Sequence, residues 1–345
     1  MILLWLKFII TALIIIFSGI RLCHYGDQIA QRTGLTRAWI GIILIAAITS
    51  LPEVVTSLGA TLMVKAPDLA LGNLLGSNAF NLMALGFLLI IYRQRRPTSK
   101  IVGGAICSLF GIILVGIVGA GILSRSPFSL GWFGLDSLLI LIIYLLGMRI
   151  VYGYEHRNKS PKSPEGQAYG AGKVPAKGEA RQRRRSPKLN HEGIYLRFII
   201  AALFIVGAGI WLANLGEEIA IKTHWGRTFV GSFFLAVTTS LPEVVVAGTA
   251  LKMGALDMAI GALLGSNMFN LVIIPLTDIF YRPKPILGQV SFTNLLTAGI
   301  VITLTIITLG GLLYRSKKKV PRFSPDSLFT ITVYLIGMYY LFKLR

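Results

Sequence analysis

Two glutamates, Glu53 and Glu243, stand in the middle of long apolar stretches of the chain. They are the only ones of its 14 acidic residues to be placed so deeply. Inside a membrane an ionised carboxylate costs several kcal/mol unless a cavity, a cation or a partner compensates for it. Both glutamates belong to the same heptapeptide, TSLPEVV, at residues 49–55 and 239–245. We therefore predict that the two carboxylates act together at one functional site.

Oxygen-bearing side chains accompany each glutamate. In a helix, residues three and four positions apart share a face, so Thr49 and Ser50 lie on the face of Glu53. The second copy repeats this arrangement with Thr239 and Ser240 before Glu243. A further repeated motif, GSNxFN, places a serine and an asparagine four residues apart on the next apolar stretch; these are Ser77 and Asn81 in the first copy and Ser266 and Asn270 in the second.

Pro52 and Pro242 add backbone oxygens to this set. Proline has no N–H, so it leaves the carbonyl four residues earlier without its helical donor and distorts the turn. At membrane depth such carbonyls are tolerated only inside protein or around a cavity, where they can coordinate ions. Carboxylate, hydroxyl, amide and carbonyl oxygens without thiolate or imidazole suit Ca²⁺ or Na⁺ rather than zinc or copper. One Ca²⁺, several Na⁺ or two protons would each neutralise the two carboxylates, and alternative neutralisation is the physical basis of ion exchange.

Other classes of function fit less well. An intramembrane enzyme needs a nucleophile with a base, but the apolar stretches hold no histidine suited to that role. The identical surroundings of Glu53 and Glu243 also argue against separate acid and base roles. A passive calcium channel would conduct without regard to a counter-ion gradient. We expect a transporter, not an enzyme, and no cofactor beyond the transported ions.

The composition requires a membrane. Of 345 residues 54% are hydrophobic and only 14% are charged, and the mean hydropathy is +0.71. This excludes a soluble enzyme, a disulfide scaffold and a disordered chain. Apolar stretches of about 20 residues, each able to cross a bilayer as a helix, predict an all-α integral membrane protein with ten transmembrane helices. We expect them at residues 2–20, 38–64, 69–92, 101–123, 132–149, 194–213, 228–252, 258–281, 290–314 and 327–343.

The net charge of +20 lies mainly in the loops. This is typical of a protein that is oriented by its loops, and we expect no nucleic-acid partner. The basic residues favour one side, which includes Arg21, residues 93–100 and the central polar segment. That side is predicted to be cytoplasmic, with both chain ends outside. Short loops and the lack of a targeting signal suit a plasma or bacterial inner membrane; beyond the lipid bilayer, we expect no obligate protein partner.

The repeated motifs divide the chain. TSLPEVV recurs at an offset of 190 residues and GSNxFN at 189, so two homologous halves are predicted. We assign residues 1–149 to a first five-helix repeat with its motif at 46–81, and 194–345 to a second with its motif at 236–270. Residues 150–193 are expected to form a basic, flexible cytoplasmic linker. Because five is odd, the second repeat crosses the membrane in the inverted sense, the arrangement of secondary transporters with a midplane substrate site.

The paired TSLPE and GSNxFN motifs resemble the alpha-repeats of the cation/calcium exchanger superfamily, particularly the prokaryotic sodium/calcium exchangers. The resemblance covers essentially the whole membrane portion. It implies the sodium/calcium exchanger fold, with a central four-helix core and a peripheral helix pair that slides between access states. It also implies antiport of Na⁺ against Ca²⁺ by alternating access, with antiport of H⁺ against Ca²⁺ or another divalent cation as the alternative.

Carried over by position, the resemblance also assigns ligands. It implies that Glu53 and Glu243 bind Ca²⁺ together with the backbone carbonyls of Thr49 and Thr239. It implies Na⁺ sites at Ala46, Ser50, Ser77 and Asn81, with counterparts at Ala236, Ser240, Ser266 and Asn270. Some members of the superfamily carry Asp at the position of Asn270. This chain therefore lacks their third carboxylate, which argues against potassium co-transport.

Overall fold

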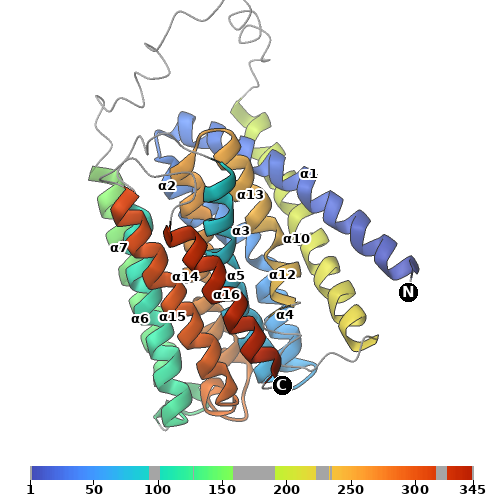
Figure 1. Cartoon of the computed structure of the whole chain (residues 1–345), viewed down its shortest axis with the longest axis vertical. Coiled ribbons are helices and arrows are strands. Elements are labelled where there is room, and N and C mark those ends of the chain that lie inside the picture. The colour runs from blue at the N-terminus through green and yellow to red at the C-terminus, as the bar shows by residue number, and fades with distance from the viewer. Residues whose placement is uncertain are drawn as a thin grey trace, which may run out of the picture.

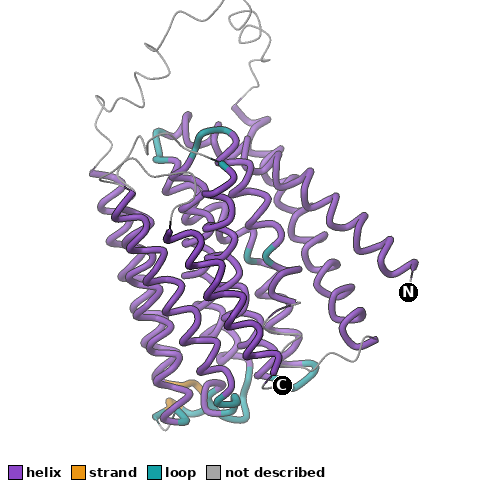
Figure 2. Tube along the Cα trace, in the orientation of Figure 1, coloured by secondary structure: helices purple, strands orange, loops and turns teal. Residues whose placement is uncertain are grey.

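The computed structural model describes residues 2–92, 102–126, 128–157, 191–222, 233, 235–315 and 325–343. Within these residues the chain is almost entirely helical, and the helices form one elongated bundle (Figures 1 and 2). The first half contains α1 Ile2–Thr33, α2 Arg37–Trp39, the π-helix η1 Ile40–Ile45, α3 Ala46–Thr49, α4 Leu51–Leu62, α5 Pro67–Ile91, α6 Val102–Ser124 and α7 Leu135–Arg157. The second contains α10 His191–Lys222, α12 Ala236–Thr239, α13 Leu241–Lys252, α14 Leu256–Phe280, the 3-10 helix η3 Ile286–Gly288, α15 Thr293–Arg315 and α16 Pro325–Lys343.

The predicted membrane spans match these helices with several corrections. Among the described residues, 8 helices are long and apolar enough to cross a membrane. Of the other two predicted spans, 228–252 begins outside the described residues, and 327–343 is helical as α16 but is not among the 8. A small antiparallel hairpin, β1 Ser129–Leu130 with β2 Phe133–Gly134, precedes α7 and was not predicted.

The helix ends were the least accurate part of the prediction. Helix α1 continues to Thr33 rather than ending near residue 20, so Arg21 lies within the helix and not in a loop. Helix α10 likewise runs to Lys222. The extension of α1 still buries apolar residues such as Leu22 and Ile29, so the helix continues past the polar Arg21 until Gly34, which has a φ of +67°. Helix α7 runs to Arg157, inside the predicted linker, and residues 158–190 lie outside the described residues.

The helices fall into two groups. α1 and α10 lie side by side at one edge of the bundle, away from α6, α7 and α15 (Figure 1). Helix α14 is the most buried span, with 83% of its apolar window inside the protein. It packs against α5, α6, α7 and η1 and so forms the centre of the fold. In Figure 1, α7 ends and α10 begins near the upper end of the bundle, α16 ends toward the lower end, and α1 begins at the right-hand edge.

Glycines bring η1 and α14 into backbone contact. A Cβ added to Gly41 would lie 2.6 Å from the carbonyl oxygen of Met258, and one added to Gly265 would lie 2.5 Å from that of Ile42. No larger residue fits without moving one backbone away from the other. This contact fixes the segment that precedes Glu53 against the helix that carries Ser266.

Candidate functional site: a buried cluster of oxygen atoms

Both predicted proline helices are broken immediately before the proline. Helix α3 ends at Thr49 and α4 begins at Leu51, with Ser50 between them at φ −88° and ψ 4°. In the second half Ser240 separates α12 from α13 at φ −85° and ψ 6°. The serine and the glutamate three residues later therefore stand where one helix ends and the next begins. The structure thus places a helix break two residues before each of Pro52 and Pro242.

The two glutamates are fully buried and are joined to the opposite half. Both side chains have 0% exposure. The Ser50 hydroxyl donates to Glu243 Oε1 at 3.0 Å, and the Ser240 hydroxyl donates to Glu53 Oε1 at 3.2 Å. Each carboxylate is thus held by a serine from the other repeat, which brings the two sequence motifs into one cluster.

The serines of α5 and α14 complete this pattern. Ser77 Oγ donates to Glu53 Oε1 and Ser266 Oγ to Glu243 Oε1, both at 3.4 Å. Two hydroxyl pairs then cross between the halves; they are Ser77 with Thr239 at 3.3 Å and Thr49 with Ser266 at 3.4 Å. The Ala46 carbonyl lies 3.5 Å from Ser266 Oγ, and Ala236 is fully buried in the equivalent place.

Asn81 and Asn270 lie in the same buried layer. Their side-chain N–H groups donate to Asn267 Oδ1 at 3.0 Å and to Asn78 Oδ1 at 3.1 Å, respectively. Asn78 and Asn267 were not predicted as site residues, although both belong to the repeated GSNxFN motif. Asn73 was also missed, and it accepts the Thr239 hydroxyl at 3.3 Å.

Four buried acceptor atoms in this cluster lack a hydrogen-bond donor. They are Glu53 Oε2, Glu243 Oε2, Asn81 Oδ1 and Asn270 Oδ1. A buried acceptor without a donor is costly, and native proteins rarely leave one without a purpose. These two carboxylate oxygens and two amide oxygens are ligands of the kind that a hard cation prefers. All twelve predicted ligands of the two halves are buried in this layer, namely Ala46, Thr49, Ser50, Glu53, Ser77, Asn81, Ala236, Thr239, Ser240, Glu243, Ser266 and Asn270.

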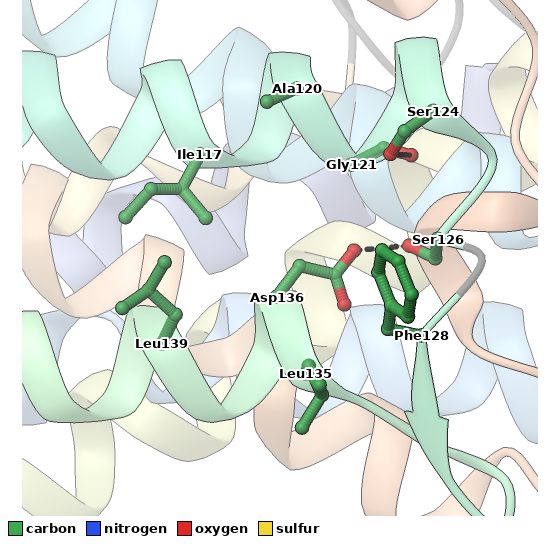
Figure 3. A pocket seen from close by; sticks show the side chains of 9 residues that line it. All are labelled: Ile117, Ala120, Gly121, Ser124, Ser126, Phe128, Leu135, Asp136 and Leu139. Atoms are coloured by element: carbon green, nitrogen blue, oxygen red, sulfur yellow. Dashed lines mark hydrogen bonds between the residues drawn. The ribbon is translucent and has the colours of Figure 1, made fainter.

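A second carboxylate cluster, at one end of α6 and α7, is structural. Asp136 accepts from the Ser126 hydroxyl and the Ser137 N–H, beside a cavity of about 260 Å³ (Figure 3). Asp278 accepts from the backbone N–H groups of Gly134 at 2.8 Å and Ile286 at 2.7 Å. These bonds tie the hairpin and η3 to the helix ends. The cavity is lined mostly by apolar side chains such as Ile117 and Leu139, so it does not resemble the oxygen cluster.

Comparison with known proteins identifies the family of this chain. The family model described as "Sodium/calcium exchanger protein" matches residues 3–153 and again 193–343. The chain belongs to the sodium/calcium exchanger family. The two matches correspond to the two repeats, and the family resemblance is confirmed.

Relatives and solved structures of this family agree. The chain is 25% identical over 270 residues to "Inner membrane protein YrbG" of Escherichia coli (strain K12), covering 77% of this chain and 76% of the relative. It is 31% identical over 112 residues to "Sodium/calcium exchanger MaX1" of Methanosarcina acetivorans, covering 32% and 29% of the two chains. A structure of the sodium-calcium exchanger NCX_Mj matches with a TM-score of 0.68 and 20% identity over 98% of each chain. The exchanger fold with two repeats is confirmed, and a transporter rather than a catalytic enzyme is indicated.

Proposed function

We propose that this chain is a secondary antiporter that exchanges Na⁺ for Ca²⁺ by alternating access, with one Ca²⁺ held between Glu53 and Glu243. The observation that carries the proposal is the set of four buried acceptor oxygens without donors, two from each repeat. Membership of the exchanger family supports cation antiport. The choice of ions and the ligand assignment belong to the proposal.

Charge balance explains why Ca²⁺ suits the two glutamates. Two ionised carboxylates carry a charge of −2, and burying that charge without compensation would cost many kcal/mol. Bound Ca²⁺ neutralises it and takes Glu53 Oε2 and Glu243 Oε2 as ligands. The backbone carbonyls of Thr49 and Thr239, at the two helix breaks, would complete the coordination.

Sodium ions would occupy the sub-sites on either side. In the first half the ligands are Ala46, Ser50, Ser77 and Asn81, and in the second they are Ala236, Ser240, Ser266 and Asn270. Ser50 and Ser240 donate to a glutamate in the present arrangement, and rotation of each hydroxyl would turn a lone pair toward Na⁺. Small hydroxyl and amide oxygens suit sodium, and no third carboxylate is available for a further cation.

Alternating access then follows from the cost of the empty site. The halves can exchange access only when the carboxylates are neutralised by Ca²⁺ or by Na⁺, because the uncompensated charge opposes occlusion. An inward sodium gradient would therefore drive calcium extrusion. We place the protein in a plasma or inner membrane, with both ends outside and residues 158–190 cytoplasmic.

Exchange of H⁺ for Ca²⁺ is the second candidate. It is favoured by one observation, the free Oε2 atom on each of the buried glutamates, since protonation would also neutralise both groups. The serine-rich sub-sites would then have no ion to bind, which is why we prefer sodium.

The deciding experiment uses the whole chain in proteoliposomes. Vesicles loaded with sodium are diluted into sodium-free buffer containing radiolabelled calcium, with choline-loaded and acid-loaded vesicles as controls. Uptake that requires internal sodium would support the proposal. Uptake driven only by the proton gradient would reassign the counter-ion, and uptake indifferent to both gradients would overturn antiport.

A further inference from the structure

Four asparagines form a closed arrangement of hydrogen bonds between α5 and α14. The Asn78 side chain donates to the backbone carbonyl of Asn267, and the Asn267 side chain donates to that of Asn78, both at 3.1 Å. Asn81 donates to Asn267 Oδ1 and Asn270 donates to Asn78 Oδ1. We call this arrangement of Asn78, Asn81, Asn267 and Asn270 the amide clasp. It lies almost fully buried, with exposures from 0% to 7%.

The orientation of every amide in the clasp is fixed by the two backbone carbonyls. A carbonyl oxygen only accepts, so Asn78 and Asn267 must turn their NH₂ groups toward it. Their Oδ1 atoms then face Asn81 and Asn270 as acceptors. These two residues must in turn present NH₂ to the clasp.

The last consequence concerns the candidate ion site. The clasp holds the NH₂ groups of Asn81 and Asn270, so the Oδ1 atom of each side chain points away from the clasp. These two Oδ1 atoms are the amide oxygens that lack a hydrogen-bond donor. If an amide rotated by half a turn, its NH₂ group would point where the oxygen now points and would repel a cation. The clasp therefore imposes an oxygen-only lining.

We propose that Asn78 and Asn267 are positioning residues that set the cation affinity of the site by locking the amide orientation of Asn270 and Asn81, respectively. This inference rests on the proposed function, because it assumes that the free oxygens bind a transported cation. Neither Asn78 nor Asn267 needs to touch the ion. The pairing is crossed, because each of these two residues fixes the amide orientation of an asparagine in the other repeat, and this crossed pairing is what the test must detect.

The test is a pair of double-mutant cycles on calcium uptake in sodium-loaded vesicles. Asn78→Ala removes the acceptor for Asn270 and is expected to raise the half-saturating calcium concentration about tenfold, with a smaller change in maximal rate. In a background of Asn270→Ala the same substitution should have almost no further effect, because the amide that it releases is gone. Combined with Asn81→Ala it should instead be additive, since Asn267 still holds its bond to the Asn78 backbone.

The mirror cycle uses Asn267→Ala. Its effect on the half-saturating calcium concentration should nearly vanish in a background of Asn81→Ala and should add to the effect of Asn270→Ala. Each variant is checked by size-exclusion chromatography in detergent, and one that aggregates is replaced by the serine substitution at the same position. Equal coupling of Asn78 to Asn81 and to Asn270, or additivity in all cycles, would overturn the inference. Failure of the unmutated protein to take up calcium in exchange for sodium would instead count against the proposed function.

Discussion

The two halves of the molecule are alike at the ion site but differ where the peripheral helices meet it. At the site most bonds of one half have a counterpart in the other, as in the bonds Ser50 to Glu243 and Ser240 to Glu53. At the periphery the corresponding glycines of α1 and α10, Gly19 and Gly209, meet different partners. The comparison separates a nearly symmetric core from a helix pair that contacts the two halves unequally, and under the proposed alternating access this pair would be the part that moves.

The glycine contacts give the size of this difference. A Cβ on Gly209 would collide with Cγ of Pro52, directly beside the first helix break. The symmetric contact for Gly19 would be Pro242, yet a Cβ on Gly19 would lie 2.8 Å from Cγ1 of Val245. Three residues of helix correspond to a rise of about 4.5 Å. The two contacts therefore differ by about 4.5 Å of helix rise, and the position that treats both halves alike lies about half that distance from the present one.

Inversion symmetry indicates the other access state. Exchanging the roles of the two halves would place Gly19 against Pro242 and Gly209 against Val55, the residue equivalent to Val245. The core contact between Gly41 and Met258 need not change. This explains how a slide at one edge could alter access to a site whose own bonds are nearly identical in both halves.

Neutralising the glutamates is expected to have the largest effect and tests the symmetry of the site. Glu53→Gln and Glu243→Gln should each abolish sodium-dependent calcium uptake, because each removes one of the two carboxylates that would neutralise bound Ca²⁺. Breaking such a buried pairing of opposite charges costs about 3–5 kcal/mol, more than 100-fold in affinity. The measurement is radiolabelled calcium flux in proteoliposomes. Glu218→Gln is the control, since Glu218 is exposed and pairs only with Lys222 at 2.6 Å among the ion pairs of the described residues. Retained activity in either glutamate variant would refute the site.

Substituting Gly209 or Gly19 by alanine should shift the populations of the two proposed access states in opposite directions. Gly209→Ala places a methyl group against the rigid Pro52 ring and should disfavour the present state by about 1–3 kcal/mol, or about tenfold or more in population. A methyl group on Gly19 meets Val245 Cγ1 in the present state, where the valine side chain can rotate, but it would meet the rigid Pro242 ring in the opposite state. Gly19→Ala should therefore disfavour the opposite state more strongly. Thiol labelling of cysteines introduced on either side of the site would report the change. If both variants shifted labelling in the same direction, the proposed slide would be wrong.

A smaller change is expected from Asn270→Asp, which makes the two halves unequal at the site. An ionised aspartate cannot donate to Asn78 Oδ1, so the clasp loses one bond and the site gains a charge. We expect the sodium or potassium dependence of calcium uptake to change about fivefold. Measuring uptake across a sodium series with and without potassium checks this, and Asn214→Asp, at an exposed position of α10 outside the site, serves as the comparison. An unchanged ion profile would show that Asn270 is not a ligand.

Deleting residues 165–184 is expected to have no effect on basal transport. The segment belongs to neither predicted repeat, and both repeated motifs lie outside it. Calcium uptake by the shortened protein, normalised to the amount inserted in vesicles, tests this. A folded and inserted variant without transport would contradict the assignment of residues 150–193 as a linker.

The sequence predicted the two repeats well because they are marked by local motifs. The same motifs singled out the residues that the structure gathers into the buried oxygen cluster, whereas their role as ion ligands stays a prediction. The amide clasp could not be found in this way. Its bonds join residues 186 to 192 positions apart in the sequence, so they depend on how α5 and α14 pack. The ends of α1 and α10 were wrong for a related reason, since a hydropathy pattern marks the apolar stretch rather than the end of the helix.

The crossed bonds between serines and glutamates bear on the origin of the protein. Because Ser50 serves Glu243 and Ser240 serves Glu53, neither half contains a finished site of its own. A single ancestral five-helix polypeptide could have built this site only as a homodimer of oppositely inserted copies, which requires an ancestor without a strong bias in its loop charges. Gene duplication and fusion would have fixed the two orientations in one chain, and the basic loops could then diverge without costing either copy its partner.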